Sequence, residues 1–135
     1  GYNLLVSSST NDEATWKSDF LSYYSNIGGA NIPYTPKAAR TLIGYRKNTN
    51  DVALVTVYGN VDSDLPKSAG PTYFESFLIM RYLGCSMALA LDGSTCTKIR
   101  YKENGANKCI DSGRETWCRI CLTDNAARSC DWTGT

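Results

Sequence analysis

The sequence contains no histidine, the side chain that most often moves protons near neutral pH or binds a metal ion. A glycine-rich phosphate loop, a G-x-S-x-G elbow and an H-E-x-x-H segment are also absent. The thirteen acidic residues form no recognisable pair across a cleft, which a glycosidase with two carboxylates would need. We therefore predict that the protein is not an enzyme, with no catalytic residues, no cofactor and no metal site.

The chain has almost no net charge, because 14 basic side chains face 13 acidic ones and leave a formal charge of +1. No global field therefore draws it to nucleic acid or to anionic membranes. No uninterrupted apolar run is as long as a membrane-spanning helix. We expect a soluble monomer that forms one domain over residues 1–135, with neither nucleic acid nor membrane as a partner.

The first 84 residues contain no cysteine, and all six cysteines lie between Cys85 and Cys130. An even number in a small chain indicates disulfides made in an oxidising compartment, whereas a zinc site would want a second C-x-x-C pair or histidines. The start at Gly1 lacks a signal sequence, which fits a secreted protein whose signal has been removed. We predict three disulfides, with the pairing left open, among Cys85, Cys96, Cys109, Cys118, Cys121 and Cys130.

Cys118 and Cys121 have the C-x-x-C spacing of thiol–disulfide enzymes. The motif lies in an alternating segment, residues 115–122, which is typical of a strand, so the two side chains point to opposite faces. No helix follows to activate a thiolate. Two structural half-cystines with different partners explain the motif better than a redox centre.

The first helix is predicted to start near Thr10 and Glu13, which have capping-box spacing, and to end at Gly28. Its apolar residues recur at helical intervals and form one stripe. We expect this stripe to face a core rather than to form an aromatic binding groove. Its members are Trp16, Phe20, Tyr23, Tyr24 and Ile27.

A second helix is predicted over residues 72–91, where Thr72 and Glu75 repeat the capping-box spacing after Pro71. The segment is apolar on nearly every side, so its length favours a buried helix over a strand. Cys85 would then project from the middle of this helix.

Alternating or β-branched segments predict strands at residues 2–6, 41–45, 52–58, 96–102 and 115–122, with a turn at Asn104–Gly105. The element order is then β-α-β-β-α-β with an extra C-terminal hairpin. This order predicts an α+β, two-layer sandwich stabilised by disulfides, in which an antiparallel sheet carries two helices on one face.

Two surfaces are candidates for binding. Lys98, Arg100 and Lys102 share one face of a predicted strand, and this basic stripe would suit a phosphate, an anionic polysaccharide or an acidic protein. Lys108, Arg114 and Arg119 could extend it across the hairpin. The alternative is a solvated strand face that discourages edge pairing. The other candidate is the polar loop at residues 60–71, although the lack of an aromatic anchor in it favours a simple crossover.

In size, cysteine richness and the element order from Tyr2 to Leu122, the chain resembles the Leptosphaeria avirulence and suppressing effectors, which are secreted fungal proteins. This resemblance implies a non-enzymatic protein that binds host proteins. It would be detected by plant immune receptors or mask another effector from them. The resemblance assigns no role to any single residue.

Other classes of protein also fit the sequence. The soluble part of a bacterial minor pilin pairs a helix with a sheet, but a truncated pilin should start within its long helix rather than with a strand. A small secreted enzyme such as a ribonuclease, or a killer toxin, is a further alternative, although the lack of histidine disfavours a ribonuclease.

Overall fold

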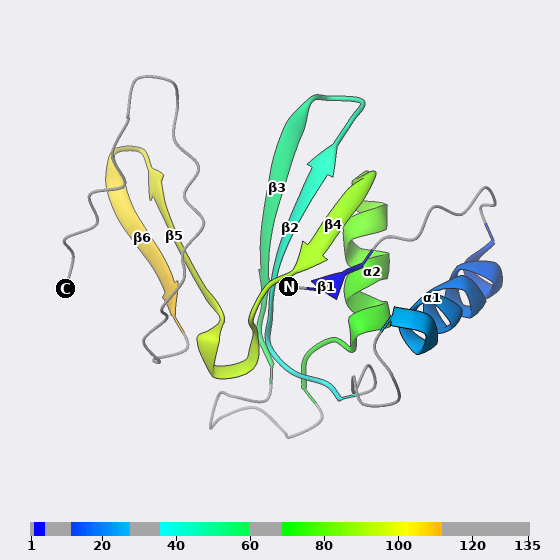
Figure 1. Cartoon of the computed structure of the whole chain (residues 1–135). Coiled ribbons are helices and arrows are strands. Elements are labelled where there is room, and N and C mark those ends of the chain that lie inside the picture. Colours follow the sequence, from blue (N-terminus) through cyan, green and yellow to red (C-terminus); the bar gives the residue numbers. More distant parts are fainter. Residues whose placement is uncertain (1, 5–11, 28–35, 60–68, 112–135) are drawn as a thin grey trace.

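The computed structural model describes residues 2–4, 12–27, 36–59 and 69–111 (Figure 1). The order of elements is β-α-β-β-α-β followed by a hairpin, but the elements are not those predicted: residues 87–90, predicted as helix, form the last strand of the main sheet, and the strand predicted at residues 96–102 belongs to the hairpin. The elements are β1 (Tyr2–Asn3), α1 (Glu13–Ile27), β2 (Arg40–Arg46), β3 (Asp51–Val57), α2 (Tyr73–Tyr82), β4 (Met87–Ala90), β5 (Lys98–Glu103) and β6 (Ala106–Asp111).

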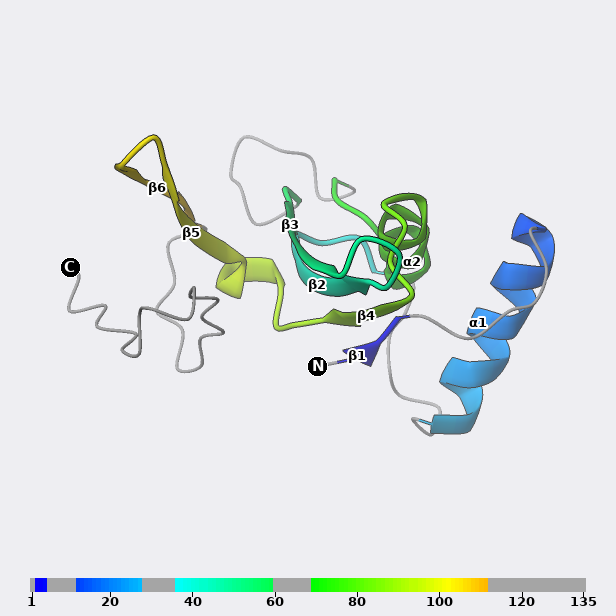
Figure 2. The ribbon, with the colours of Figure 1, turned by 90° about the horizontal axis from the view of Figure 1, so that it is seen from above.

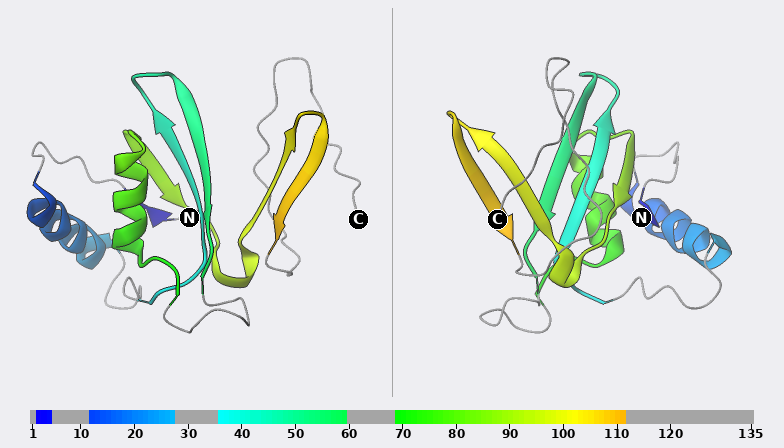
Figure 3. Two further views of the ribbon diagram at one scale, coloured as in Figure 1. Left: turned by 180° about the vertical axis from the view of Figure 1, so that it is seen from behind. Right: turned by 60° about the vertical axis from the view of Figure 1, so that its left-hand side comes forward.

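The main sheet has four antiparallel strands in the order β1-β4-β2-β3, and β5 and β6 form a separate two-stranded sheet. Both helices lie on the same side of the main sheet (Figures 1 and 2). The β5–β6 hairpin stands on the opposite side (Figure 3). The α+β class is therefore confirmed, and the structure is compatible with the two predicted layers. The prediction of one sheet is wrong, because the strand predicted at residues 96–102 pairs with β6 in a second sheet. None of the helices in the described ranges is long and apolar enough to cross a membrane.

The two faces of the main sheet differ because side chains alternate along each strand. Leu42, Ala88 and Ala90 are buried and belong to the core between sheet and helices. The alternate positions of the same strands, such as Tyr45 and Leu89, are exposed on the face without helices. The helices thus cover only half of the sheet's apolar surface.

Helix α1 begins at Glu13, and its cap is Asp12 rather than the predicted Thr10, which lies outside the described residues. The backbone N–H of Thr15 donates to Asp12 Oδ2 (3.0 Å), as an N-cap requires. The stripe faces the core as predicted, since Trp16, Phe20 and Tyr24 are buried.

Helix α2 starts with the predicted capping box at Thr72 and Glu75 but ends at Tyr82, so the prediction of a helix to residue 91 is wrong. Gly84 has a φ of +80°, which turns the chain back. Residues 87–90 then form β4, paired with β2. The long apolar run is a buried helix followed by a strand with one buried face, which periodicity alone does not separate.

The hairpin turn at Asn104–Gly105 is confirmed, and both residues have positive φ, as a two-residue hairpin turn requires. The strand that pairs with β5 is β6, which the sequence analysis missed. The predicted strand at residues 115–122 lies outside the described residues.

Aromatic rings join α1 to α2 in the core. The Phe20 ring lies with its centroid 4.5 Å from that of Tyr24, 5.4 Å from Phe74 and 5.7 Å from Phe77. Phe20 is completely buried, so it holds the first helix on the second.

We expect Phe20→Ala to lower the free energy of unfolding by about 3–5 kcal/mol, because it removes a ring that both helices contact. Urea unfolding followed by circular dichroism measures the loss. The matched control is Tyr58→Ala, at a ring that is 62 % exposed, which should change stability by less than about 0.5 kcal/mol. Similar losses in both variants would contradict this account of the core.

Candidate functional site

Three segments meet the start of β2 at one end of the sheet, and we call this region the β2 junction: Ala38–Arg40 with residues 58–59, 69–72 and 91–94. Each segment brings a glycine against the backbone just before β2. A Cβ on Gly59 would lie 2.1 Å from the Ala39 nitrogen, one on Gly70 2.5 Å from the Ala38 oxygen, and one on Gly93 2.7 Å from the Ala39 oxygen. Larger residues have no room in these places.

Arg40 is buried in this junction, with 6 % of its surface exposed. Its Nη2 donates to the Pro36 carbonyl (2.8 Å), its Nε donates to the Pro71 carbonyl (3.4 Å), and the guanidinium lies 4.0 Å from the centre of the Tyr73 ring. Among the described residues no carboxylate forms an ion pair with it. A buried permanent cation without a counter-ion favours an anionic ligand nearby, because an unpaired buried charge is costly.

The start of α2 adds a second basic group and a carboxylate. Lys37 Nζ lies 3.7 Å from Glu75 Oε1. Glu75 also accepts the Thr72 backbone N–H (2.7 Å), and this hydrogen bond is the main reason why the pKa of Glu75 lies below its usual value. Glu75 is therefore an ionised, structurally engaged carboxylate and a poor proton donor.

The turn after β4 presents Asp92 and Ser94 to solvent at the same end of the sheet. The backbone N–H of Leu91 donates to the Thr41 carbonyl (2.8 Å), and that of Ser94 donates to the Ala39 carbonyl (2.8 Å). Ser94 has a φ of +55°, which is unfavourable for a residue with a side chain. Such strain is concentrated at functional sites, so it marks this turn as a candidate.

Two threonine hydroxyls near this turn are buried and have no hydrogen-bond partner in the described part of the chain, those of Thr41 and Thr97. Thr41 adjoins Leu91, and Thr97 follows the short 3₁₀ turn Ser94–Cys96. Unpaired buried hydroxyls are rare, since most find a partner in the protein or in ordered water. The junction therefore combines a buried cation, an exposed carboxylate and unused hydroxyls.

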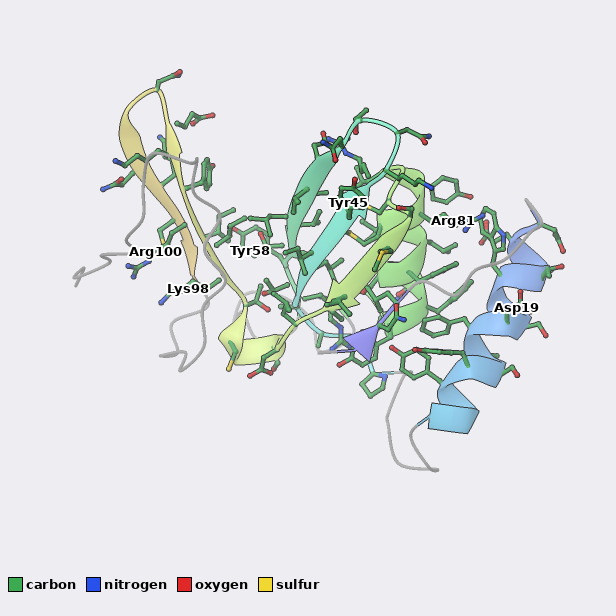
Figure 4. All side chains as sticks on the ribbon, turned by 45° about the horizontal axis from the view of Figure 1, so that its top comes forward. Asp19, Tyr45, Tyr58, Arg81, Lys98 and Arg100 are labelled. Atoms are coloured by element: carbon green, nitrogen blue, oxygen red, sulfur yellow. The ribbon has the colours of Figure 1, made fainter. Side chains whose placement is uncertain are left out.

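The basic residues predicted from the sequence lie elsewhere, on the β5–β6 hairpin. Lys98, Arg100 and Lys102 share one face of β5, as predicted, and Figure 4 shows Lys98 and Arg100 on this hairpin. Lys108 is paired with Tyr101, which lies on the other face, so the predicted extension through Lys108 is wrong. Arg114 and Arg119 lie outside the described residues.

The predicted loop at residues 60–71 is described only from residue 69. Its last residue, Pro71, accepts hydrogen bonds from Arg40 and from the Ala38 backbone N–H (3.4 Å). Residues 69–71 of the predicted loop therefore form part of the β2 junction. The rest of the loop lies outside the described ranges.

Cys85 does not project from a helix, because α2 ends before it. Cys85 is buried against Gly44 of β2: a Cβ added to Gly44 would lie 2.6 Å from the Cys85 sulfur. Burial raises the pKa of the Cys85 thiol. In the part of the chain that the structure describes, Cys85 is a free thiol, which contradicts the predicted bridge from this residue. Cys118, Cys121 and Cys130 lie outside the described residues, and the pairing of the cysteines other than Cys85 stays a prediction. Within the described ranges no three histidine, cysteine or acidic side chains gather as a metal site.

Sequence reasoning missed the residues of the junction. Arg40 was overlooked at the start of a strand, and Asp92 and Gly93 were interpreted only as the end of a helix. The signal that could have found them is the Asp-Gly-Ser sequence at 92–94 after a buried strand, because a turn with positive φ at such a position is typical of a functional loop.

A family model described as "NAGPA: Phosphodiester glycosidase" matches residues 6–120 of the chain. No curated protein and no solved structure matches it. The family description names an enzyme, which conflicts with our prediction that the protein is not one. No comparison bears on the resemblance to fungal effectors, which stays a prediction.

The unpaired hydroxyl of Thr97 predicts an unusual response to mutation. Burying a hydroxyl without a hydrogen bond costs about 1–3 kcal/mol, so Thr97→Val should keep or raise the free energy of unfolding. Urea unfolding measures it. The comparison variant is Thr72→Val, which removes a hydroxyl that accepts the Glu75 N–H and should cost about 1 kcal/mol. A loss at Thr97 as large as that at Thr72 would show that the Thr97 hydroxyl is bonded.

The lowered pKa of Glu75 predicts a dependence of stability on pH. Since the folded-state pKa lies below the unfolded value of about 4.3, the ionised carboxylate stabilises the fold above that pH, and this contribution is lost as the pH falls through the folded pKa. Glu75→Gln keeps a capping residue but does not titrate. The stability difference between the two proteins should therefore shrink as the pH falls from 7 towards about 3. A difference that does not change with pH would contradict this.

Proposed function

The chain belongs to the NAGPA phosphodiester glycosidase family, whose model covers residues 6–120, and we propose on that ground that it hydrolyses a sugar 1-phosphodiester. Water would replace the phosphodiester oxygen at the sugar's anomeric carbon. The products are then a reducing sugar and a phosphate monoester. The family match carries this proposal, and the geometry of the β2 junction supports it.

The absence of histidine does not oppose this reaction. The group that leaves the sugar is a phosphate monoester, whose second pKa is about 6, so it departs as a stable anion. Strong protonation by a general acid, which an ordinary glycosidase needs for a sugar or alkoxide leaving group, is then less important. One carboxylate for the attacking water and a cation for the phosphate are enough.

Arg40 is the cation that we assign to the phosphate. It is fixed by two carbonyls and the Tyr73 ring, and no carboxylate of the described ranges pairs with it. It is buried where an electrostatic interaction is weakly screened. A fixed positive charge that stabilises negative charge as it develops is a large contribution to catalysis. In this proposal Arg40 lowers the energy of the departing phosphate.

Asp92 is the carboxylate that we assign to the attacking side. It is exposed, it follows directly after the last buried part of β4, and the turn that carries it is pinned to the β2 backbone. Its role is to accept a proton from the attacking water or to attack the anomeric carbon itself. Glu75 is excluded from this role because it caps α2.

A second proposal is the one that the effector resemblance implies: a secreted protein that binds a host protein. It is favoured by the β5–β6 hairpin, where every residue from Tyr101 to Cys109 is exposed. A hairpin with both faces in solvent is a common contact element. A protein that hydrolyses no sugar 1-phosphodiester but still binds a host protein would favour this role over the enzymatic one.

We expect Asp92→Asn to lower kcat/KM for a sugar 1-phosphate methyl ester by at least about 100-fold, as loss of a general base or nucleophile does. Release of reducing sugar measures the rate, and the free energy of unfolding should be unchanged within about 0.5 kcal/mol because Asp92 is exposed.

The matched control is Asp19→Asn, at a partly exposed carboxylate on α1, away from the β2 junction (Figure 4). Its activity should equal that of the unchanged protein. If the unchanged protein releases no sugar from any 1-phosphodiester, the enzymatic proposal fails. If Asp92→Asn is fully active, the assignment of Asp92 fails.

A further inference from the structure

The side of the main sheet away from the helices carries a continuous apolar surface, which we call the open face. It is built by three neighbouring strands. In one row Leu54, Ile43 and Leu89 are register partners, and in the next row Val52, Tyr45 and Met87 are. Figure 4 shows Tyr45 on this sheet. The open face consists of Ile43, Tyr45, Val52, Leu54, Met87 and Leu89.

These side chains are unusually exposed for apolar residues in a sheet. Met87 is 67 % exposed, Leu89 44 % and Val52 43 %. The β5–β6 hairpin stands on the same side of the sheet (Figures 1 and 3), and these side chains are exposed beside it. A contiguous exposed apolar patch on a small protein marks a binding surface more often than chance.

The open face runs directly into the candidate site. Along β4 its row is Met87 and Leu89, and the next alternating position is Leu91, whose backbone N–H donates to Thr41. Asp92 follows at once. From Met87 to Leu91 this row is about 13 Å long. The apolar surface therefore ends next to the turn that carries the carboxylate assigned to catalysis. Arg40, which shares the face of Leu42 on β2 and contacts Tyr73, lies at the same end of the sheet on the helix side.

The charge pattern restricts what can bind there. On β2, β3 and β4 the positions that face this side are apolar or threonine, and none is charged; they are Thr41, Ile43, Tyr45, Val52, Leu54, Thr56, Met87 and Leu89. Asn3 of β1, the register partner of Leu89, adds one uncharged amide at the edge of the sheet. A polysaccharide or a nucleic acid would lose hydrogen bonds with water and find few in return. An uncharged hydrocarbon chain has no hydrogen bonds with water to lose when it binds to this surface.

We propose that the open face binds the hydrocarbon chain of the substrate's alcohol, so that the preferred substrate is a sugar 1-phosphate esterified with a long alkyl or prenyl alcohol. This inference rests on the proposed function. The phosphodiester lies at the β2 junction, the sugar lies on the Asp92 side, and the chain extends along Leu91, Leu89 and Met87. Hydrolysis at the anomeric carbon then releases the sugar and leaves a phosphate monoester on the long alcohol.

The test is a series of sugar 1-phosphate esters with methyl, hexyl and decyl alcohols, assayed below micelle-forming concentrations. Each methylene that leaves water improves binding by up to about fourfold, so on a half-open surface the decyl ester should show a KM at least about tenfold below that of the methyl ester. The kcat should change less, because the chain lies outside the reacting bonds.

The outcomes separate the two proposals. Equal KM values along the series would overturn the inference and leave the proposed function standing. No cleavage of any ester would overturn the proposed function. Calorimetry with decyl phosphate against methyl phosphate then still tests the open face, and equal affinities would overturn the inference too. A second copy of the chain on this face would show as a dimer in sedimentation and would also remove the dependence on chain length.

Leu89→Gln should remove most of the gain from the decyl chain while leaving the KM of the methyl ester unchanged. The matched control is Leu83→Gln. Leu83 is 42 % exposed against 44 % for Leu89, but it lies at the C-cap of α2. If both variants keep the full chain-length effect, the inference is wrong. If Leu89→Gln fails to fold, the series on the unchanged protein decides alone.

Discussion

The close approach of three segments to the backbone at Ala38–Arg40 is the constraint on which the rest of the structure depends. Gly59 follows β3, Gly70 precedes α2 and Gly93 follows β4, yet each leaves no space for a Cβ against the same stretch of chain. This packing fixes where β3 ends, where α2 starts and where β4 turns away. It also buries the Arg40 guanidinium, so the fold and the positive charge of the candidate site have one common origin.

Much of the architecture follows from local patterns in the sequence. The capping box at Thr72 and the turn at Asn104–Gly105 are local signals, and both are confirmed. Strand β4 was not predicted, because an apolar helix and a strand with one buried face form a single apolar run in the sequence. In the structure the positive φ of Gly84 separates the two elements. Strand β6 was missed because its sequence, ANKCID, mixes apolar and polar residues on both faces, so apolar residues do not recur with a period of two.

The candidate site was less predictable than the fold. Its residues are far apart in the chain, and a buried arginine has the same sequence signature as an exposed one at a strand start. The basic stripe on β5 was predicted correctly as a shared face, because period two needs no knowledge of tertiary contacts. What sequence reasoning lacked was the pairing of β2 with β4, which brings Asp92 to Arg40's end of the sheet.

The position of Cys85 has a consequence for oxidative folding. Its sulfur lies between the sheet and α2, beneath Gly44, and burial keeps it in the unreactive thiol form. Once the helix layer has closed, this sulfur no longer takes part in thiol–disulfide exchange, and five cysteines remain for pairing within the chain. Packing of the helices on the sheet thus keeps the Cys85 thiol away from the other cysteines, which limits the number of non-native disulfides that they can form.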